Sequence, residues 1–330
     1  MNASTPIIDL FPGLANVPDG RAPHDDDSRL TQELLRCERA VARGEFAAMG
    51  CFYGSIPKDS PYFVWAAGVA LIGAVGTGDG MLFDFVLGDV QAYPQRVVTE
   101  EAALAAEIWG VWMRQVLRIE GHGPKWLDEC DLHGIPSVWR PWALMFSSAH
   151  LAARGELVAA RALASVLLSH GHGTVPFGSL MDIRLKLMLA DAYRDEGMME
   201  KSAKWCREAV LSAKVHGYVL PFLTQPLGPK SALGLAIQEL APEFQPTIRR
   251  QASSYFRNVV RFHNRVTGDA VTELLAPREF YVAESLVRGL RYKEIAERLG
   301  IAYCRVNELV TCVHDKLHIH GSSELKPFVW

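Results

Sequence analysis

Residues 275–319 read LAPREFYVAESLVRGLRYKEIAERLGIAYCRVNELVTCVHDKLHI, and their pattern of apolar residues and glycines predicts three short helices. The first opens with Pro277, which a helix tolerates in its first turn, and reaches an expected C-cap at Gly289. The second covers residues 292–299 and ends at Gly300. The third covers residues 303–317 and places four apolar side chains on one face: Val306, Val310, Val313 and Leu317. Two helices joined by a glycine-containing turn form a helix-turn-helix, whose later helix can enter a major groove.

The motifs in this stretch resemble the LuxR/GerE-type DNA-binding domain of bacterial transcription regulators. The matching elements are Leu275-x-Pro277-Arg278-Glu279, Gly289-Leu290, Lys293-Glu294-Ile295-Ala296-Glu297-Arg298-Leu299, Ile301, Val306 and Lys316-Leu317. They cover about the last fifth of the chain. The resemblance implies that the partner is double-stranded DNA and that the positions matching the family's base contacts are Asn307, Glu308 and Thr311.

The third predicted helix departs from this family where the chemistry would lie. The family usually has a hydroxyl residue at the N-cap, then Thr-Val-Lys and a His two residues after the Lys. Those positions here hold Ala302, Arg305-Val306-Asn307 and Leu309. A helical projection places Cys304, Glu308, Thr311 and Asp315 opposite the apolar stripe. Acids on that face oppose binding to a polyanion, because Lys and Arg supply much of the affinity for DNA.

Base reading remains available to this face, because Asn can pair with adenine, Glu can accept from cytosine and Thr can contact either. We therefore assign DNA binding to Lys293, Tyr303, Arg305, Asn307, Glu308 and Thr311. Within this set, Lys293 and Arg305 are the candidates for phosphate contacts.

A basic helix is predicted immediately before the helix-turn-helix, over residues 247–266. Residues 244–330 contain 13 Lys and Arg against 9 acids, whereas the whole chain carries a net charge of −3. The positive charge lies mainly in five arginines of an acid-free stretch, Arg249, Arg250, Arg257, Arg261 and Arg265. The helix is interpreted either as a linker that caps the preceding region or as a phosphate-binding element through Arg257, Arg261 and Arg265.

The region before the basic helix is predicted to be a helical-repeat array. Segments beginning at Cys37, Ala149 and Ala190 share small residues, a glycine (Gly44, Gly155 and Gly197) and further alanines. The pattern is similar to tetratricopeptide repeats, in which a tight glycine turn joins two antiparallel helices. Such pairs stack into an array with a concave surface. A helical bundle without true repeats is the alternative.

Tryptophans are concentrated between the first two of these segments. Trp109, Trp112, Trp126, Trp139 and Trp142 are five of the eight tryptophans in the chain. They are interpreted as core residues or as a pocket for a small-molecule or peptide effector, with Trp109, Trp112, Trp139 and Trp142 as pocket candidates. The uncharged residues 60–78 approach membrane-spanning length, but their Gly and Ala content predicts a buried core helix.

Other function classes find little support in the sequence. The six cysteines are scattered without a CxxC pair, which favours a reducing cytoplasm over disulfides or zinc. The pairs His170/His172 and His318/His320 lack further ligands at metal spacing, and the glycine-rich residues 73–80 lack the Lys-Ser/Thr ending of a phosphate loop. No nucleophile–base constellation can be assembled. We therefore expect no catalytic residues, no metal and no cofactor.

Taken together, the sequence predicts an all-α, cytoplasmic transcription regulator in four parts. These are a lead-in (1–27), a tetratricopeptide-like sensor (28–243), a basic linker helix (244–270) and a LuxR-type helix-turn-helix (271–330). If the protein forms a homodimer, the contacts are expected from the N-terminal part, because Lys326-Pro327 interrupts a fourth helix. The alternatives are an adaptor whose degenerate helix-turn-helix binds protein and a helical protein attached to a membrane through residues 60–78.

Overall fold

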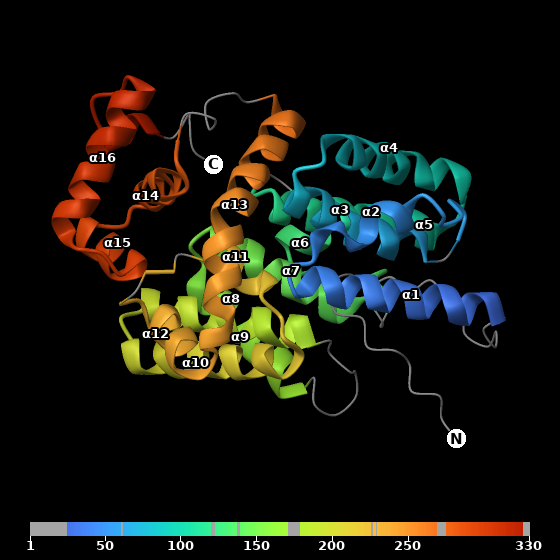
Figure 1. Ribbon diagram of the computed structural model, residues 1–330, viewed down its shortest axis with the longest axis horizontal. Helices are drawn as coiled ribbons and strands as arrows, with labels where there is room; N and C mark the ends of the chain where they lie inside the picture. Colours follow the sequence, from blue (N-terminus) through green and yellow to red (C-terminus); the bar gives the residue numbers. More distant parts are fainter. Residues whose placement is uncertain are drawn as a thin grey trace. The chain divides into compact units, whose positions relative to one another are not determined.

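The fold is all-helical over the residues that the structure describes (Figure 1). The structure is a computed structural model that describes residues 25–60, 62–119, 123–136, 139–170, 179–225, 227–228, 230–268 and 275–325. Its internal contacts define two units. The first unit comprises Met1–Met113 and His122–Pro221, and the second comprises Arg114–Gly121 and Phe222–Trp330. The predicted lead-in lies outside the described residues, except that helix α1 already begins at Asp25.

The first half of the first unit is organised around one wholly buried helix. The helices here are α1 (Asp25–Ala42), η2 (Phe46–Met49), α2 (Gly50–Tyr53), α3 (Phe63–Thr77), α4 (Gly80–Arg96), α5 (Glu100–Val116) and α6 (Lys125–Asp128). Every residue of α3 from Phe63 to Val75 is buried. The glycines of α3 admit a neighbouring side chain, since a Cβ on Gly76 would lie 1.9 Å from Cγ of Phe46. The core helix predicted within residues 60–78 is therefore α3, Phe63–Thr77.

No helix among the described residues combines the length and the apolar character needed to cross a bilayer. Helix α3 has 15 residues, whereas a transmembrane helix needs about 20.

The second half of the first unit consists of two helix pairs. They are α7 (Arg140–Ala153) with α8 (Leu157–His170), and α9 (Ser179–Asp195) with α10 (Met199–His216). Gly155 and Gly197 adopt left-handed backbone at φ 82° and 77°, which allows the sharp reversal between the members of each pair. Helix α8 also contacts α9, so the four helices pack in sequence. A tetratricopeptide array remains a prediction.

The segment around Gly44 differs from these two pairs. Gly44 is also left-handed, at φ 89°, but the chain then forms η2 and the single turn α2 rather than a long antiparallel helix. The Phe46 ring packs against Gly76 of α3, Gly50 is the first residue of α2, and Gly54 is its C-cap. The described residues after Gly44 therefore lack the long second helix that the repeat pattern predicts for this segment.

The second unit contains the predicted basic helix and the three predicted C-terminal helices. Its elements are the end of α11 (Leu220–Leu223), α12 (Ala232–Leu240), η3 (Pro242–Phe244), α13 (Gln245–Thr267), α14 (Pro277–Val287), α15 (Tyr292–Leu299), α16 (Tyr303–Leu317) and η5 (Ser322–Leu325). The apolar face predicted for the basic helix is buried: Ile248, Tyr255, Phe256, Val259, Val260 and Phe262. All five of its arginines are exposed, as their positions opposite that face predict.

Two clusters of buried side chains hold the C-terminal helices together. One joins α14, α15 and α16 through residues that include Val282, Ile295 and Val306. The other joins α13 to α14 and to the end of α16 through residues that include Phe256, Phe280 and Val313. Helix α13 thus shares a core with α14 and α16. The four-part division stays a prediction, and the contacts group residues 222–243 with the later helices rather than with the repeats.

Candidate functional site

Local hydrogen bonds fix the start of α14 and the start of α15, and a glycine ends α15. The backbone N–H of Ala276 donates to Oε2 of Glu279 at 2.7 Å, and that of Arg291 donates to Oε2 of Glu294 at 2.7 Å. In each case a carboxylate at the third helical position satisfies a backbone donor near the helix start. Gly300 then closes α15 in left-handed conformation, at φ 61°. Glu294 and Gly300 thus fix the two ends of α15, and Gly300 begins the turn to α16.

Helix α16 is two-faced, as its sequence predicts. Val306, Leu309, Val310, Val313 and Leu317 are buried. The opposite side is exposed and carries all five of the DNA-binding candidates on this helix: Tyr303, Arg305, Asn307, Glu308 and Thr311. Lys293 is exposed on α15, and the Tyr292 ring at the start of α15 lies 6.1 Å from the Tyr303 ring. In Figure 1 these two helices form the red end of the chain.

On the exposed face the charge of Glu308 is balanced locally, because Glu308 forms an ion pair with Arg305 on the same helix. The hydrogen bond from Arg305 to Glu308 and the charge of that carboxylate raise the pKa of Arg305 above its ordinary value. Thr311 donates its hydroxyl to the carbonyl of Asn307 at 3.0 Å. The side-chain amide of Asn307 makes no hydrogen bond to another described residue, and the residue is exposed, so this amide is open to solvent.

Leu309, one of the departures from the family pattern, is a packing residue. It is 6% exposed and lies in the cluster that joins α14, α15 and α16. Its apolar side chain therefore belongs to the core of the three-helix unit rather than to the exposed face. Of the departures in α16, those at Arg305 and Asn307 are the ones that reach the surface.

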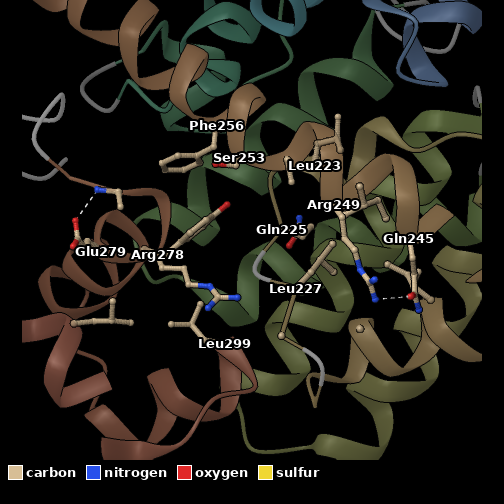
Figure 2. Close-up of a pocket in the computed structure, with 18 of the residues that line it drawn as sticks. Leu223, Gln225, Leu227, Gln245, Arg249, Ser253, Phe256, Arg278, Glu279 and Leu299 are labelled. Atoms are coloured by element: carbon tan, nitrogen blue, oxygen red, sulfur yellow. Dashed lines mark hydrogen bonds between the residues drawn. The ribbon is translucent and has the colours of Figure 1, made fainter. Parts of the chain in front are cut away.

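A cavity of about 870 Å³ lies between two walls of the second unit (Figure 2). One wall is formed by residues of the α11–α12 region and α13, and the other by residues of α14, α15 and α16. Arg249, Arg278 and Arg305 line it, together with a largely apolar floor. In Figure 2, Arg278 extends into the space between the walls, while Arg249 turns toward Gln245, to which it donates at 3.0 Å. No pattern in the sequence indicates this cavity, because its lining residues come from separate helices.

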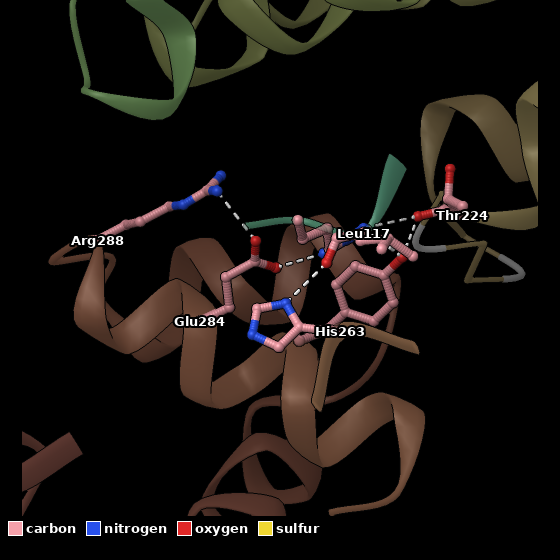
Figure 3. Close-up of polar contacts among 7 residues, drawn as sticks. Leu117, Thr224, His263, Glu284 and Arg288 are labelled. Atoms are coloured by element: carbon pink, nitrogen blue, oxygen red, sulfur yellow. Dashed lines mark hydrogen bonds and ion pairs between the residues drawn. The ribbon is translucent and has the colours of Figure 1, made fainter. Parts of the chain in front are cut away.

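A second feature that the sequence did not reveal is a polar network around Arg118 (Figure 3). The guanidinium of Arg118 donates to Oε2 of Glu284 at 2.8 Å, to Oη of Tyr281 at 3.0 Å and to the carbonyl of Thr224 at 3.2 Å. It also stacks on the Tyr281 ring at 4.8 Å. Nδ1 of His263 donates to the carbonyl of Leu117 at 2.8 Å. The short segment after α5 is thus bonded to both α13 and α14.

Arg118 is kept protonated by its own partners in the network, Glu284 and Tyr281. Burial alone would lower the pKa of Arg118, but the carboxylate of Glu284 and the hydroxyl of Tyr281 raise it above its ordinary value. Arg118 therefore stays protonated. Glu284 has a second cationic partner in Arg288, at 2.9 Å. Arg118 also has left-handed backbone, at φ 56°, which is uncommon for a residue with a side chain.

The remaining candidate residues lie in two groups. Arg257, Arg261 and Arg265 are exposed on α13, and the guanidinium of Arg261 lies 4.7 Å from the Phe262 ring centroid. Trp109, Trp112, Trp139 and Trp142 are all buried in the first unit, with exposures from 0% to 9%. Trp126 is buried as well and donates to Oε1 of Glu107 at 2.7 Å. These tryptophans form part of the core, and their role as an effector pocket stays a prediction.

Among the described residues, no three His, Cys, Asp or Glu side chains are arranged so that they could hold a metal ion. His318 and His320 are exposed, and the pair at His170 and His172 falls on residues that the structure does not describe in full.

Comparison with known proteins assigns this chain to no family: no family model, no curated protein and no solved structure matches it.

Proposed function

We propose that this chain is a transcription regulator that binds double-stranded DNA by laying α16 in the major groove. The observation that carries the proposal is the two-faced α16. Its apolar stripe is buried against α14 and α15, while Asn307, Glu308 and Thr311 project outward with Arg305. A helix of 15 residues is about 22 Å long at 1.5 Å per residue, which is ample for three to four base contacts.

The charges divide naturally into phosphate contacts and base contacts. Lys293 is exposed at the start of α15 and makes no ion pair with another described residue, so its ammonium is available to a phosphate. Arg305 would exchange Glu308 for a phosphate at little cost, because both side chains are more than half exposed. Asn307 offers the amide that pairs with adenine N6 and N7, and the released Glu308 can accept from cytosine N4.

Regulation is the second part of the proposal. The helical first unit would sense a ligand or partner, and its binding would favour the state or oligomer in which two α16 helices match half-sites about 34–36 Å apart.

The test is selection of binding sequences from a random double-stranded DNA library, followed by fluorescence anisotropy at several salt concentrations. We expect enrichment of a defined sequence. Lys293→Ala should reduce the slope of log affinity against log salt by about one, since one phosphate contact is lost. The matched control is Lys204→Ala, which removes an exposed lysine from α10 of the first unit and should leave the slope unchanged. Absence of any enriched sequence, with a salt-independent signal, would contradict the proposal.

A rival function is favoured by one specific observation, the exposed acids Glu308 and Asp315 on the same face. They suit an adaptor whose helix-turn-helix binds a protein. The double variant Asn307→Lys/Thr311→Lys separates the two functions. A DNA-binding protein should gain both affinity and salt slope, whereas an adaptor should show no response to DNA in either form.

A further inference from the structure

We propose that the cavity between α12–α13 and the helix-turn-helix is a binding site for a small organic anion with an apolar part. The volume of about 870 Å³ lies within the range of 300 to 1,000 Å³ that is typical of ligand pockets. Both walls belong to the second unit, and every described residue that lines the cavity lies in that unit.

The charge of the cavity selects an anion. Among the described lining residues the cations are Arg249, Arg278 and Arg305. Arg305 is paired with Glu308 and Arg249 donates to the neutral Gln245, whereas Arg278 makes no ion pair with another described residue, so Arg278 supplies the uncompensated charge. The acid on the lining, Glu279, is already neutralised, because it accepts from Lys316 at 2.6 Å and from the N–H of Ala276. Planar guanidinium groups bind carboxylate, sulfonate and phosphate oxygens with paired hydrogen bonds.

The rest of the lining selects an apolar body for that anion. Its buried apolar members are Leu223, Ile237, Ile248, Phe256, Leu299 and Leu309. Gln225, Gln238 and Ser253 add neutral donors and acceptors. A purely polar ion such as inorganic phosphate would leave the apolar floor wet. A ring or chain that carries one acidic group would satisfy both parts of the lining.

Occupancy would bear directly on α16, and this step rests on the proposed function. Arg305 both lines the cavity and lies on the face assigned to DNA. A bound anion that engages Arg305 removes a phosphate contact and bridges α13 to α14. The ligand is therefore expected to weaken DNA binding.

The test uses the full chain and the fluorescent probe 1-anilinonaphthalene-8-sulfonate, with N-phenyl-1-naphthylamine as its uncharged analogue. We expect saturable binding of the sulfonate and at least tenfold weaker binding of the neutral analogue. Arg278→Ala should weaken sulfonate binding about tenfold, the loss expected for one hydrogen bond to a charged group. Arg291→Ala is the matched control, since Arg291 is an exposed arginine that pairs with Glu294 and does not line the cavity.

Two further measurements complete the test. Ala252→Trp should fill the cavity and abolish probe binding while circular dichroism stays helical; if that variant does not fold, the arginine variants still decide. Equal affinity of the wild type, Arg278→Ala and Arg291→Ala for the sulfonate would overturn the site. Equal affinity for the neutral analogue would overturn the requirement for an anion.

The DNA arm is read separately. With a selected DNA fragment, probe at a saturating concentration should weaken DNA binding at least fivefold, and unchanged DNA affinity would overturn the coupling to α16. Absence of DNA binding by the chain without probe would refute the proposed function, whereas the cavity is decided by probe fluorescence in the absence of DNA.

Discussion

Replacing Arg118 by Met tests whether the polar network of Figure 3 holds α14 in place. The substitution removes three hydrogen bonds from the guanidinium, to Glu284, Tyr281 and Thr224, while a chain of similar length still covers the Tyr281 ring. The carboxylate of Glu284, whose side chain is only 11% exposed, keeps one cationic partner, Arg288.

The size of the effect follows from these contacts. Breaking a fully buried ion pair costs about 3–5 kcal/mol, and losing one hydrogen bond to a charged group costs about 1.5–3 kcal/mol. The side chain of Arg118 is 23% exposed and Glu284 retains a partner, so the lower range applies. We expect α14 to open about 2 kcal/mol more easily, which is roughly a 30-fold loss of amide protection.

Hydrogen–deuterium exchange read by mass spectrometry measures this opening in peptides from residues 277–287. Peptides from α9 and α10, in the first unit, serve as the internal reference. The control variant Arg288→Met removes the more exposed partner, 37% exposed, and should cost about 0.5 kcal/mol or less. The reasoning is refuted if Arg118→Met leaves the protection of α14 unchanged, or if the two variants have equal effects.

Three further predictions address other parts of the structure. Gly228→Ala should destabilise the second unit by about 1–3 kcal/mol in urea unfolding, because the added Cβ would lie 1.6 Å from the carbonyl oxygen of Leu299. The control Gly88→Ala, on an open face of α4, should be neutral or stabilising. Equal effects of the two variants would disprove the close approach. The exposed Cys304 and Cys312 should react with a thiol reagent at pH 8 long before Cys206, since burial raises the pKa of the Cys206 thiol to about 12. Mass spectrometry identifies the modified cysteines, and modification of Cys206 in the first fast phase would argue against this burial. The hydrogen bond from the Arg291 side chain, and then that from its backbone N–H, lower the pKa of Glu294. The stabilisation of α15 by this carboxylate should therefore be complete above the ordinary pKa of 4.5 and lost as pH falls through the depressed value. Equal amide hydrogen exchange rates in α15 for the wild type and Glu294→Gln at pH 7 would count against it.

The bounds and buried faces of α13, α15 and α16 could be predicted closely from the sequence because their signals are local. Helices α15 and α16 begin and end at the predicted residues, and each is bounded by a short-range signal such as the left-handed Gly300. The apolar stripes of α13 and α16 follow the helical period, so the buried and exposed faces of both were readable without a structure. For the same reason the exposure of Asn307, Glu308 and Thr311 was predictable.

The features that were missed depend on long-range contacts. Arg118 is separated by 166 residues from Glu284 and by 106 from Thr224, and no periodic pattern links such positions. Its left-handed backbone could not be foreseen either, because that conformation favours glycine. The cavity has the same origin, since its lining comes from several separate helices and from the loop that contains Gly228. For the tryptophans, composition alone could not separate a packed core from a pocket.

The ion pairs of the candidate face bear on the proposed function. Residues 271–330 contain no excess of Lys and Arg over Asp and Glu, which by itself does not favour a polyanionic partner. The structure pairs three of these acids individually: Glu279 with Lys316, Glu294 with Arg291, and Glu308 with Arg305. Each pair is neutral in the free protein, and an exposed pair can exchange its acid for a phosphate with a small net change in energy. Under the proposed function, affinity for DNA would depend on how many of these cations exchange partners, and a ligand that holds Arg305 in the cavity would act on the same step.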